Sequence, residues 1–287
     1  MIIPGPSSQI LSSRVARITG KKLALCDYQQ FPDGEGYVRI LDDIKGKNVT
    51  IIQSTPKDSD YISLLQLIDA CDTAKSVNVV IPYMGYARQD KRFKDGEPVS
   101  ARALAKCIHA DRVLTINIHD ESILASFNAK AENLDATPLL GSYIKTHGLE
   151  SPVFIAPDKS AFPLAKRAAE NGVDGENGKS KYECDYLEKT RHSGDTVSIA
   201  PKDLDVAGRN VVIIDDMIST GGTMAITIEL LKEQGVGKVY LACVHPILAR
   251  NGVIRLYRAG VEEIIATDTL EKAVSVVSVA SLIAKAI

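Results

Sequence analysis

The stretch VVIIDDMISTGGT, residues 211–223, joins an apolar run to two adjacent carboxylates and then to a loop of hydroxyl-bearing and glycine residues. Four consecutive apolar residues indicate a strand that is buried on both faces, as the strands of parallel sheets are. We therefore expect Asp215 and Asp216 where the carboxyl end of this strand meets solvent. The pattern predicts a parallel sheet with an acidic pair at its edge.

The loop after the acids has the composition of a phosphate site. Gly221 and Gly222 leave their backbone N–H groups unobstructed, and Ser219, Thr220 and Thr223 add hydroxyl groups. A helix pattern follows directly, and the N-terminus of a helix attracts anions through its exposed amides and partial positive charge. The sequence therefore predicts that a phosphate binds at this loop.

The two acids suit a different part of the same ligand. Carboxylates repel phosphate, but they accept hydrogen bonds from vicinal hydroxyl groups, so a sugar with a 5-phosphate would satisfy both the acids and the loop. The alternative is a strand end with solvated acids and an ordinary turn. The loop is not a Walker loop, because no G-K-[ST] follows at the required spacing.

Strand-like and helix-like runs alternate along the chain. Residues 49–54, 77–82 and 112–119 read as strands, and residues 100–110 read as a helix for which Ser100 is a candidate N-cap. Alternation of this kind predicts an α/β fold with mostly parallel sheets flanked by helices.

A weak internal repeat divides the chain. NVVI occurs at 78–81 and again at 210–213, and each copy is followed by a polar loop, a helix and a strand that ends in histidine. We therefore expect two similar domains, at 1–145 and 146–287.

Composition limits the class of protein. The formal net charge is −2, so no global basic field favours nucleic acid or an anionic membrane surface. The 5 cysteines are scattered and form no C-x-x-C pair, which is typical of reduced thiols. No segment has the length and apolarity of a signal peptide or a membrane span. These features predict a cytoplasmic protein without nucleic-acid or membrane partners.

One segment departs from the alternating pattern. Residues 174–195 are highly polar and have no sustained period. A long connection of this kind is either a lid over an active site or a disordered insertion.

Several motifs, in order along nearly the whole chain, resemble the ribose-phosphate pyrophosphokinases, a family with the type I phosphoribosyltransferase fold. They are FPDGEGYVRI (31–40), YMGYARQDKR (83–92), INIHDE (116–121), APDKSA (156–161) and the loop described above. The resemblance implies a duplicated phosphoribosyltransferase-like domain and a ribose 5-phosphate site at 215–223.

The resemblance also implies an ATP site. Phe31, Asp33 and Glu35 match residues that form an adenine pocket across a subunit interface, so it implies a homo-oligomer that is at least a dimer. Further ATP contacts are implied for Arg88, Gln89 and Asp90. The bidentate guanidinium of an arginine suits phosphate.

Metal and catalytic positions follow from the same resemblance. His119 and Asp158 match positions linked to Mg²⁺, and the carboxylate is the better ligand for this hard cation. Lys189 and Arg191 match the catalytic cations of a flexible loop, which would make the polar segment a lid. Their role would be to offset charge on the triphosphate.

The implied reaction is transfer of pyrophosphate from MgATP to the 1-hydroxyl of ribose 5-phosphate, which releases AMP and serves nucleotide biosynthesis. Many relatives carry aspartate at the position of Ser219, and regulated forms are longer, so regulation by ADP or phosphate does not follow. Two alternatives stay open. One is a phosphoribosyltransferase that uses the same loop, and the other is a non-catalytic regulatory subunit that binds nucleotide.

Overall fold

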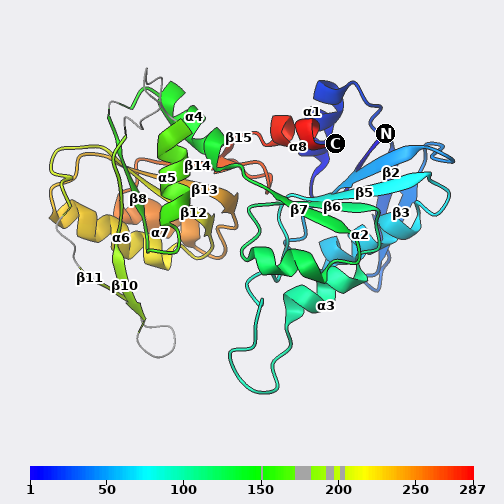
Figure 1. Cartoon of the computed structure of the whole chain (residues 1–287), viewed down its shortest axis with the longest axis horizontal. Coiled ribbons are helices and arrows are strands. Elements are labelled where there is room, and N and C mark those ends of the chain that lie inside the picture. Colours follow the sequence, from blue (N-terminus) through cyan, green and yellow to red (C-terminus); the bar gives the residue numbers. More distant parts are fainter. Residues whose placement is uncertain (150, 172–181, 192–196, 201–203) are drawn as a thin grey trace. The chain divides into compact units, whose positions relative to one another are not determined.

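The chain forms two compact units, each built on a sheet (Figure 1). The first unit comprises Met1–Asp135, Thr269–Glu271 and Ser278–Ile287, and the second comprises Ala136–Asp268 and Lys272–Val277. No helix in the described part of the chain is long and apolar enough to span a membrane. The computed structural model describes residues 1–149, 151–171, 182–191, 197–200 and 204–287, with the backbone alone at 171, 189–191 and 197–200.

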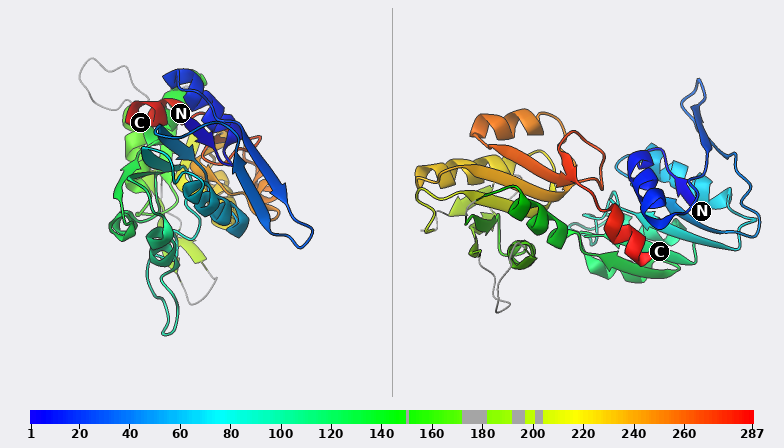
Figure 2. Two further views of the ribbon diagram at one scale, coloured as in Figure 1. Left: turned by 90° about the vertical axis from the view of Figure 1, so that its right-hand side faces the viewer. Right: turned by 90° about the horizontal axis from the view of Figure 1, so that it is seen from above.

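The first unit contains a fully parallel five-stranded sheet in the order β1-β4-β5-β6-β7. An antiparallel hairpin, β2–β3, extends away from the rest of this unit in both views of Figure 2. The strands are β1 (Ile2–Pro4), β2 (Cys26–Gln30), β3 (Gly36–Ile40), β4 (Asn48–Ile52), β5 (Ser76–Ile81), β6 (Arg112–Ile116) and β7 (Lys130–Leu134). The helices are α1 (Gln9–Thr19), α2 (Asp58–Asp69), α3 (Ser100–Cys107), the 3₁₀ helix η1 (Glu121–Ser126) and α8 (Ala280–Ala286).

The predicted strands and the helix at 100–110 are present. On α3, Ala101 and Ala105 are buried, and Ile108 follows in the same core. The predicted N-cap is wrong by one position, because Ser100 is the first helical residue and Val99 occupies the cap without a side-chain hydrogen bond. The sequence pattern does not show whether this serine is the N-cap or the first helical residue, since both positions precede the first buried side chain of the helix.

The second unit contains a fully parallel six-stranded sheet in the order β15-β14-β13-β12-β8-β9. Its helices are α4 (Thr137–Thr146), α5 (Phe162–Asn171), α6 (Gly222–Glu233) and α7 (Gly252–Ala259). Its strands are β8 (Val153–Ala156), β9 (Cys184–Tyr186), β12 (Val211–Ile218), β13 (Val239–Pro246), β14 (Glu263–Thr267) and β15 (Ser275–Val277), with β10 (Glu188–Arg191) and β11 (Val197–Ala200) in a separate antiparallel pair.

Each of the two sheets contains a similar run of four strands. The order β4-β5-β6-β7 in the first matches β8-β12-β13-β14 in the second, and in each run the chain order is the spatial order. The repeated NVVI stretches lie at equivalent positions, on β5 and at the start of β12. The predicted α/β fold with two similar domains is confirmed.

The compact units differ from the predicted ranges at both ends of the second domain. The predicted boundary after residue 145 falls within α4, which packs on α5. The two helices approach closely at Gly141, where a Cβ would lie 2.1 Å from the carbonyl oxygen of Ala168. At the other end, α8 returns to the first unit and packs on α1. These assignments depend on helix packing between distant segments, which a local composition change does not reveal.

Strand β12 is longer than its apolar run. Pairing with β8 ends at Ile213, whereas pairing with β13 continues to Ile218. Asp215 and Asp216, which were expected where the carboxyl end of the strand meets solvent, therefore lie within the strand near that end, at the point where one neighbour has already ended. The main-chain groups of β12 still have a partner on the β13 side, so the strand continues through the acids.

The polar segment is not a featureless connection. Strand β9 adds to the sheet edge beside β8, and β10 pairs with β11. Residues 174–181 and 192–195 of the predicted lid lie outside the described residues.

Candidate active site

The predicted phosphate loop joins β12 to α6. Gly221 caps the helix in the left-handed conformation, with φ of 72°. A Cβ at this residue would lie 3.0 Å from Cγ of Leu256 on α7, so both the backbone angle and the packing call for glycine. The sequence thus places a tight turn directly before the first helical N–H groups.

The loop is held from one side by the segment that follows β13. Three successive carbonyl oxygens accept hydrogen bonds from that segment: Ile218 from the N–H of Leu248 (2.9 Å), Ser219 from the N–H of Ala249 (3.0 Å) and Thr220 from Nη1 of Arg255 (2.9 Å). These three carbonyls are therefore hydrogen-bonded to protein donors.

The N–H groups of the same loop differ from its carbonyls in their hydrogen bonding. Among the described residues, the N–H groups of Ser219, Thr220 and Gly221 form no hydrogen bond to a main-chain acceptor. Those of Gly222 and Thr223 open a helix and have no intrahelical partner. A loop whose carbonyls are bonded and whose amides are available can bind an anion.

The paired carboxylates precede this loop. Both residues are half-buried, and the N–H of Asp216 donates to Oδ1 of Asp215 at 2.9 Å. Burial raises the pKa of Asp215 well above its usual range, and the negative charge of Asp216 raises it further. The pair is therefore a concentrated acceptor site that hydroxyl donors would stabilise.

Asp158 lies close to this pair. It follows β8, the strand next to β12, and its charge also contributes to the raised pKa of Asp215. Its Oδ1 accepts from the N–H groups of Ser160 (3.0 Å) and Ala161 (3.2 Å), which fixes the carboxylate before α5. The structure thus brings a predicted metal position and the predicted sugar positions to one edge of the second sheet.

The predicted adenine residues occupy the turn of the β2–β3 hairpin. The turn is closed by a hydrogen bond from the N–H of Phe31 to the carbonyl of Glu35 (2.8 Å), and the N–H of Glu35 donates to Oδ1 of Asp33 (3.2 Å). Phe31 is 51% exposed, and its ring lies edge-on to the ring of Tyr37, with the two ring centroids 6.1 Å apart. An exposed aromatic ring on a projecting hairpin can stack on a base supplied from outside this unit.

The other predicted positions of the first unit follow β5 and β6, which are adjacent strands. Arg88, Gln89 and Asp90 come after β5, and His119 comes after β6. Asp90 lies within hydrogen-bonding reach of Asp120, whose pKa is lowered mainly by hydrogen bonds from Ser122. The structure therefore brings the two strand ends together.

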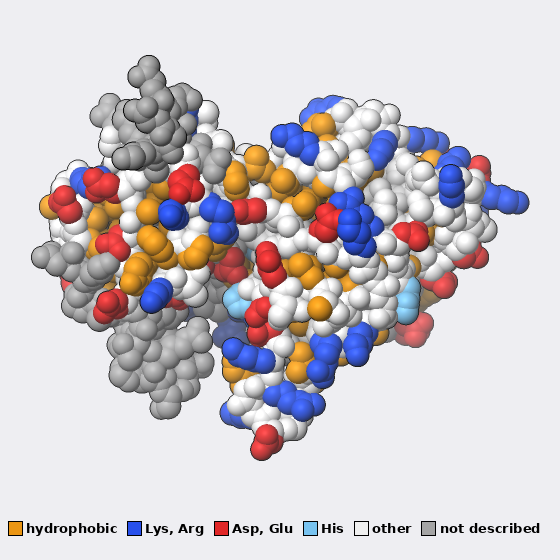
Figure 3. Space-filling view, viewed as in Figure 1, with side chains coloured by type: hydrophobic (Ala, Val, Ile, Leu, Met, Phe, Trp, Pro, Cys, Tyr) orange, Lys and Arg blue, Asp and Glu red, His pale blue; other side chains and the backbone are white. Residues whose placement is uncertain are grey.

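A basic loop extends from this edge. Figure 3 shows Lys and Arg side chains gathered over α3 and the loop after β5. In that loop Glu97 accepts from the N–H groups of Phe93 (2.9 Å) and Lys94 (3.1 Å), and the Phe93 ring is 64% exposed. The exposed cations here are Arg88, Lys91, Arg92, Lys94, Arg102 and Lys106. The first unit thus presents positive charge beside its predicted nucleotide positions.

The predicted catalytic cations lie on a strand. Lys189 pairs in register with Ile199, and Arg191 pairs with Val197, so both belong to the β10–β11 hairpin and not to an irregular loop. Paired strands were missed because the segment is polar on both faces and lacks the alternation that marks a half-buried strand.

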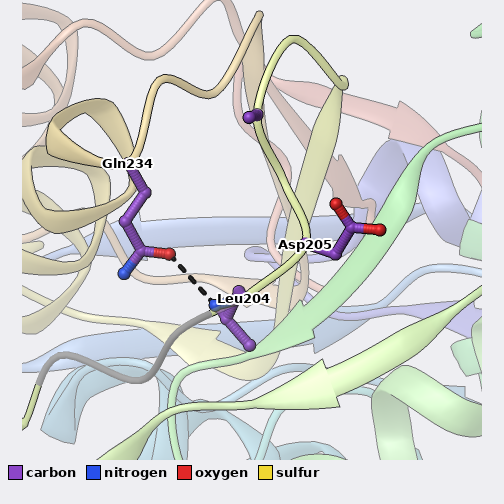
Figure 4. Close-up of a pocket in the computed structure, with 4 residues that line it drawn as sticks. Leu204, Asp205 and Gln234 are labelled. Carbon is purple, nitrogen blue, oxygen red and sulfur yellow. Dashed lines mark hydrogen bonds between the residues drawn. The ribbon is translucent and has the colours of Figure 1, made fainter.

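A cavity of about 460 Å³ lies elsewhere in the second unit, as Figure 4 shows. Its lining includes Asp205 and Gln234, and Oε1 of Gln234 accepts from the N–H of Leu204 at 3.3 Å. Gln234 follows the C-terminus of α6, at the opposite end of the helix from Gly221. None of the predicted site residues is among the described residues that line this cavity.

Sequence reasoning missed two contributors to these sites. These are Asp120, within the motif at 116–121, and Arg255, which belongs to none of the motifs. Arg255 contacts a loop 35 residues earlier in the chain, and no local pattern marks such a contact. A metal-ligand cluster of three or more His, Cys, Asp or Glu side chains is not found among the described residues.

Comparisons with family models and with known relatives point to the same family. Residues 1–111 match the N-terminal domain of ribose phosphate pyrophosphokinase, and residues 127–281 match the phosphoribosyl transferase domain. The ribose-phosphate pyrophosphokinase of Methanosarcina mazei is 59% identical over 286 residues, which cover 100% of this chain and 94% of the relative. Ribose-phosphate pyrophosphokinase 2 of Archaeoglobus fulgidus is 44% identical over 99% of this chain and 98% of the relative.

A solved structure agrees over the whole chain. Phosphoribosylpyrophosphate synthetase from Mycobacterium smegmatis superposes with a TM-score of 0.84 at 29% identity, covering 100% of this chain and 96% of the other. The matches span both sheets and the loop at 215–223. The chain is an enzyme that belongs to the ribose-phosphate pyrophosphokinase family.

Proposed function

We propose that the enzyme transfers pyrophosphate from MgATP to the 1-hydroxyl of ribose 5-phosphate and thereby forms 5-phosphoribosyl 1-pyrophosphate and AMP. The observation that carries the proposal is the loop at 219–223, whose carbonyls are bonded to protein while its amides are available, directly after two half-buried acids. The 5-phosphate would bind the amides, and the 2- and 3-hydroxyls would donate to Asp215 and Asp216.

The ring hydroxyls would also relieve an unfavourable state of the free enzyme. Asp215 is half-buried beside the negative charges of Asp216 and Asp158, so its ionised form is destabilised. Hydroxyl donors stabilise the ionised carboxylates. Binding of the sugar is therefore favoured where water is partly excluded.

The nucleotide would bind at positions of the first unit. Phe31 would stack on adenine, with Asp33 and Glu35 accepting from its exocyclic amine, while Arg88 and Gln89 contact the triphosphate. Because Phe31 is on a projecting hairpin, the stacked base would belong to a partner subunit's site, which requires at least a homodimer. The exposed cations after β5 would attract the polyanion.

Mg²⁺ fits an oxygen-rich position better than a closed protein cage. Among the described residues no three acidic, histidine or cysteine side chains are arranged to hold a metal ion by themselves, so a cation here would be held by one or two protein ligands together with substrate phosphates and water. The metal positions that we assign are Asp158 in the second unit and, separately, His119 in the first. The chemistry that the metal supplies when bound is neutralisation of triphosphate charge.

Lys189 and Arg191 would stabilise the charge that develops as pyrophosphate leaves AMP. No covalent enzyme intermediate is required, because alignment of the 1-hydroxyl with the β-phosphorus and charge stabilisation lower the barrier together. The cations would come from the β10–β11 hairpin.

Release of AMP from ATP, ribose 5-phosphate and Mg²⁺ is the test. We expect the purified enzyme to form AMP and phosphoribosyl pyrophosphate in equal amounts, with no AMP when ribose 5-phosphate is omitted. If no AMP forms, but a second assay with phosphoribosyl pyrophosphate and a nucleobase yields a nucleotide and pyrophosphate, the protein would be a phosphoribosyltransferase instead. ATP binding without either reaction would identify a regulatory subunit.

A further inference from the structure

We propose that Arg255 is a positioning residue of the sugar-phosphate site, acting through the peptide group between Thr220 and Gly221. Its Nη1 donates to the carbonyl oxygen of Thr220 at 2.9 Å, across 35 residues of chain. The inference rests on the proposed function, because it assigns a task to Arg255 in binding the 5-phosphate.

The effect on the loop follows from peptide geometry. The carbonyl of Thr220 and the N–H of Gly221 belong to one planar trans peptide group, so they point in opposite directions. A donor that fixes the carbonyl therefore fixes the N–H on the other side of the loop. Among the described residues this N–H has no protein acceptor, so it is available to an anion.

The positive charge adds to the geometric effect. A guanidinium at the carbonyl oxygen polarises the peptide group and makes its N–H a stronger donor. The same Nη1 would lie 3.5 Å from a Cβ placed on Gly222, so the cation stands next to the first residue of α6. Arg255 therefore strengthens the donor end of the loop without contacting the phosphate.

Helix α7 is placed to hold this side chain there. A Cβ on Gly252 would lie 3.2 Å from the carbonyl oxygen of Ser219, and Leu256 packs beside Gly221. Arg255 lies three residues after Gly252, on the same side of the helix. The close approach of α7 thus brings the guanidinium to Thr220.

Arg255 is also the one side chain among the three donors. Leu248 and Ala249 donate to the carbonyls of the loop through their main-chain N–H groups, and most substitutions preserve these donors. Substitution of Arg255 removes only the hydrogen bond to the carbonyl of Thr220. The effect of this one peptide orientation on sugar binding can therefore be measured.

The test compares Arg255→Ala, Arg255→Lys and Arg258→Ala. Arg258 is exposed on the same helix, so its removal deletes an equal charge without touching the loop. We expect Arg255→Ala to raise KM for ribose 5-phosphate about tenfold, the effect of losing roughly one hydrogen bond, while kcat and KM for ATP change little. Arg255→Lys, which keeps a cationic donor, should recover most of the affinity, and Arg258→Ala should behave as wild type.

Two outcomes would overturn the assignment. The first is an unchanged KM for ribose 5-phosphate in Arg255→Ala, and the second is an equal rise in Arg258→Ala, which would show a general effect of charge. Calorimetric titration of each folded protein with ribose 5-phosphate alone gives the same comparison without turnover. Absence of AMP release by wild type would reject the proposed function, whereas the titration still decides the role of Arg255.

Discussion

The N–H of Asp216 donates to Oδ1 of the neighbouring Asp215 at 2.9 Å. The contact fixes one carboxylate against the main chain of the other residue, at the level where β12 has lost its β8 neighbour. Two negative charges are thereby held together at a partly buried position. This arrangement costs stability in the free enzyme and favours a ligand with adjacent hydroxyl groups.

Asp215→Asn should stabilise the free protein and abolish sugar binding. Because the pKa of Asp215 is raised, mainly by burial, the folded state binds a proton more tightly than the unfolded state, and stability falls as pH rises from 3.8 towards the raised pKa. The amide carries no charge and avoids this loss. We expect Tm at neutral pH to rise by about 2–4 °C, the shift that roughly 1 kcal/mol produces in a protein of this size.

The pH dependence provides the control for this substitution. Below pH 3.8 the carboxyl is protonated in both states, so the Tm difference between Asp215→Asn and wild type should shrink there. A variant that is less stable than wild type at neutral pH would show that the carboxylate makes favourable contacts that outweigh its burial. Titration with ribose 5-phosphate should show no binding to the variant.

Gly221→Ala and Gly235→Ala form a matched pair at the two ends of α6. Both glycines have positive φ, 72° and 75°, so alanine should cost about 1 kcal/mol of unfolding free energy at either position. Only at Gly221 does the new Cβ meet other atoms, with Leu256 Cγ at 3.0 Å, whereas nothing lies within 4 Å at Gly235.

Urea denaturation and steady-state kinetics separate the two effects. We expect both variants to lose stability, with the greater loss in Gly221→Ala, and only that variant to show a raised KM for ribose 5-phosphate. A similar rise in Gly235→Ala would mean that helix stability, and not loop geometry, controls sugar binding.

Glu132→Gln should change the acid stability of the first unit. Arg112 forms a forked pair with Glu132, at 3.1 Å from Nε to Oε1 and 2.8 Å from Nη2 to Oε2, and its Nη1 donates to the carbonyl of Ala286 on α8 at 2.6 Å. The hydrogen bonds from Arg112, with those from Lys130, lower the pKa of Glu132 to about 2. The pair therefore stabilises the fold above pH 4.5 and loses its effect as pH falls from 4.5 to about 2.

Thermal unfolding across that pH window tests the pair. Glu132→Gln should have a lower Tm than wild type at pH 7, and the two proteins should converge near pH 2. Glu229→Gln, at an exposed position on α6, is the control and should follow wild type throughout. A constant difference between Glu132→Gln and wild type at all pH values would exclude the ion pair as its cause.

Lys189→Ala should reduce turnover and leave ATP affinity almost intact. A cation that acts on charge developing in the transition state contributes mainly to kcat, by a factor of about 10²–10³. Single-turnover kinetics and ATP titration measure the two quantities. Lys166→Ala, at an exposed position on α5, removes the same charge elsewhere in the unit and should keep wild-type turnover. Wild-type turnover in Lys189→Ala would exclude this lysine from the mechanism.

Much of the fold was accessible from local patterns. The runs at 49–54, 77–82 and 112–119 contain most or all of β4, β5 and β6, because each run is long enough to cross a sheet, although each strand ends before its predicted last residue. The acids and the glycine loop are recognisable because the groups that we propose to bind one ligand lie within thirteen consecutive residues, 211–223. Contiguity of this kind makes a site visible before any packing is known.

The sequence by itself determined the chemistry at the strand ends, since residue type and strand order already place acids and amides at the edge of a parallel sheet. Only the tertiary structure decided which distant groups complete it: Asp158 beside Asp215, Arg255 on the carbonyl of Thr220, α4 with the second unit and α8 with the first. Such contacts depend on how helices pack and where neighbouring strands stop, and no short stretch of residues encodes either.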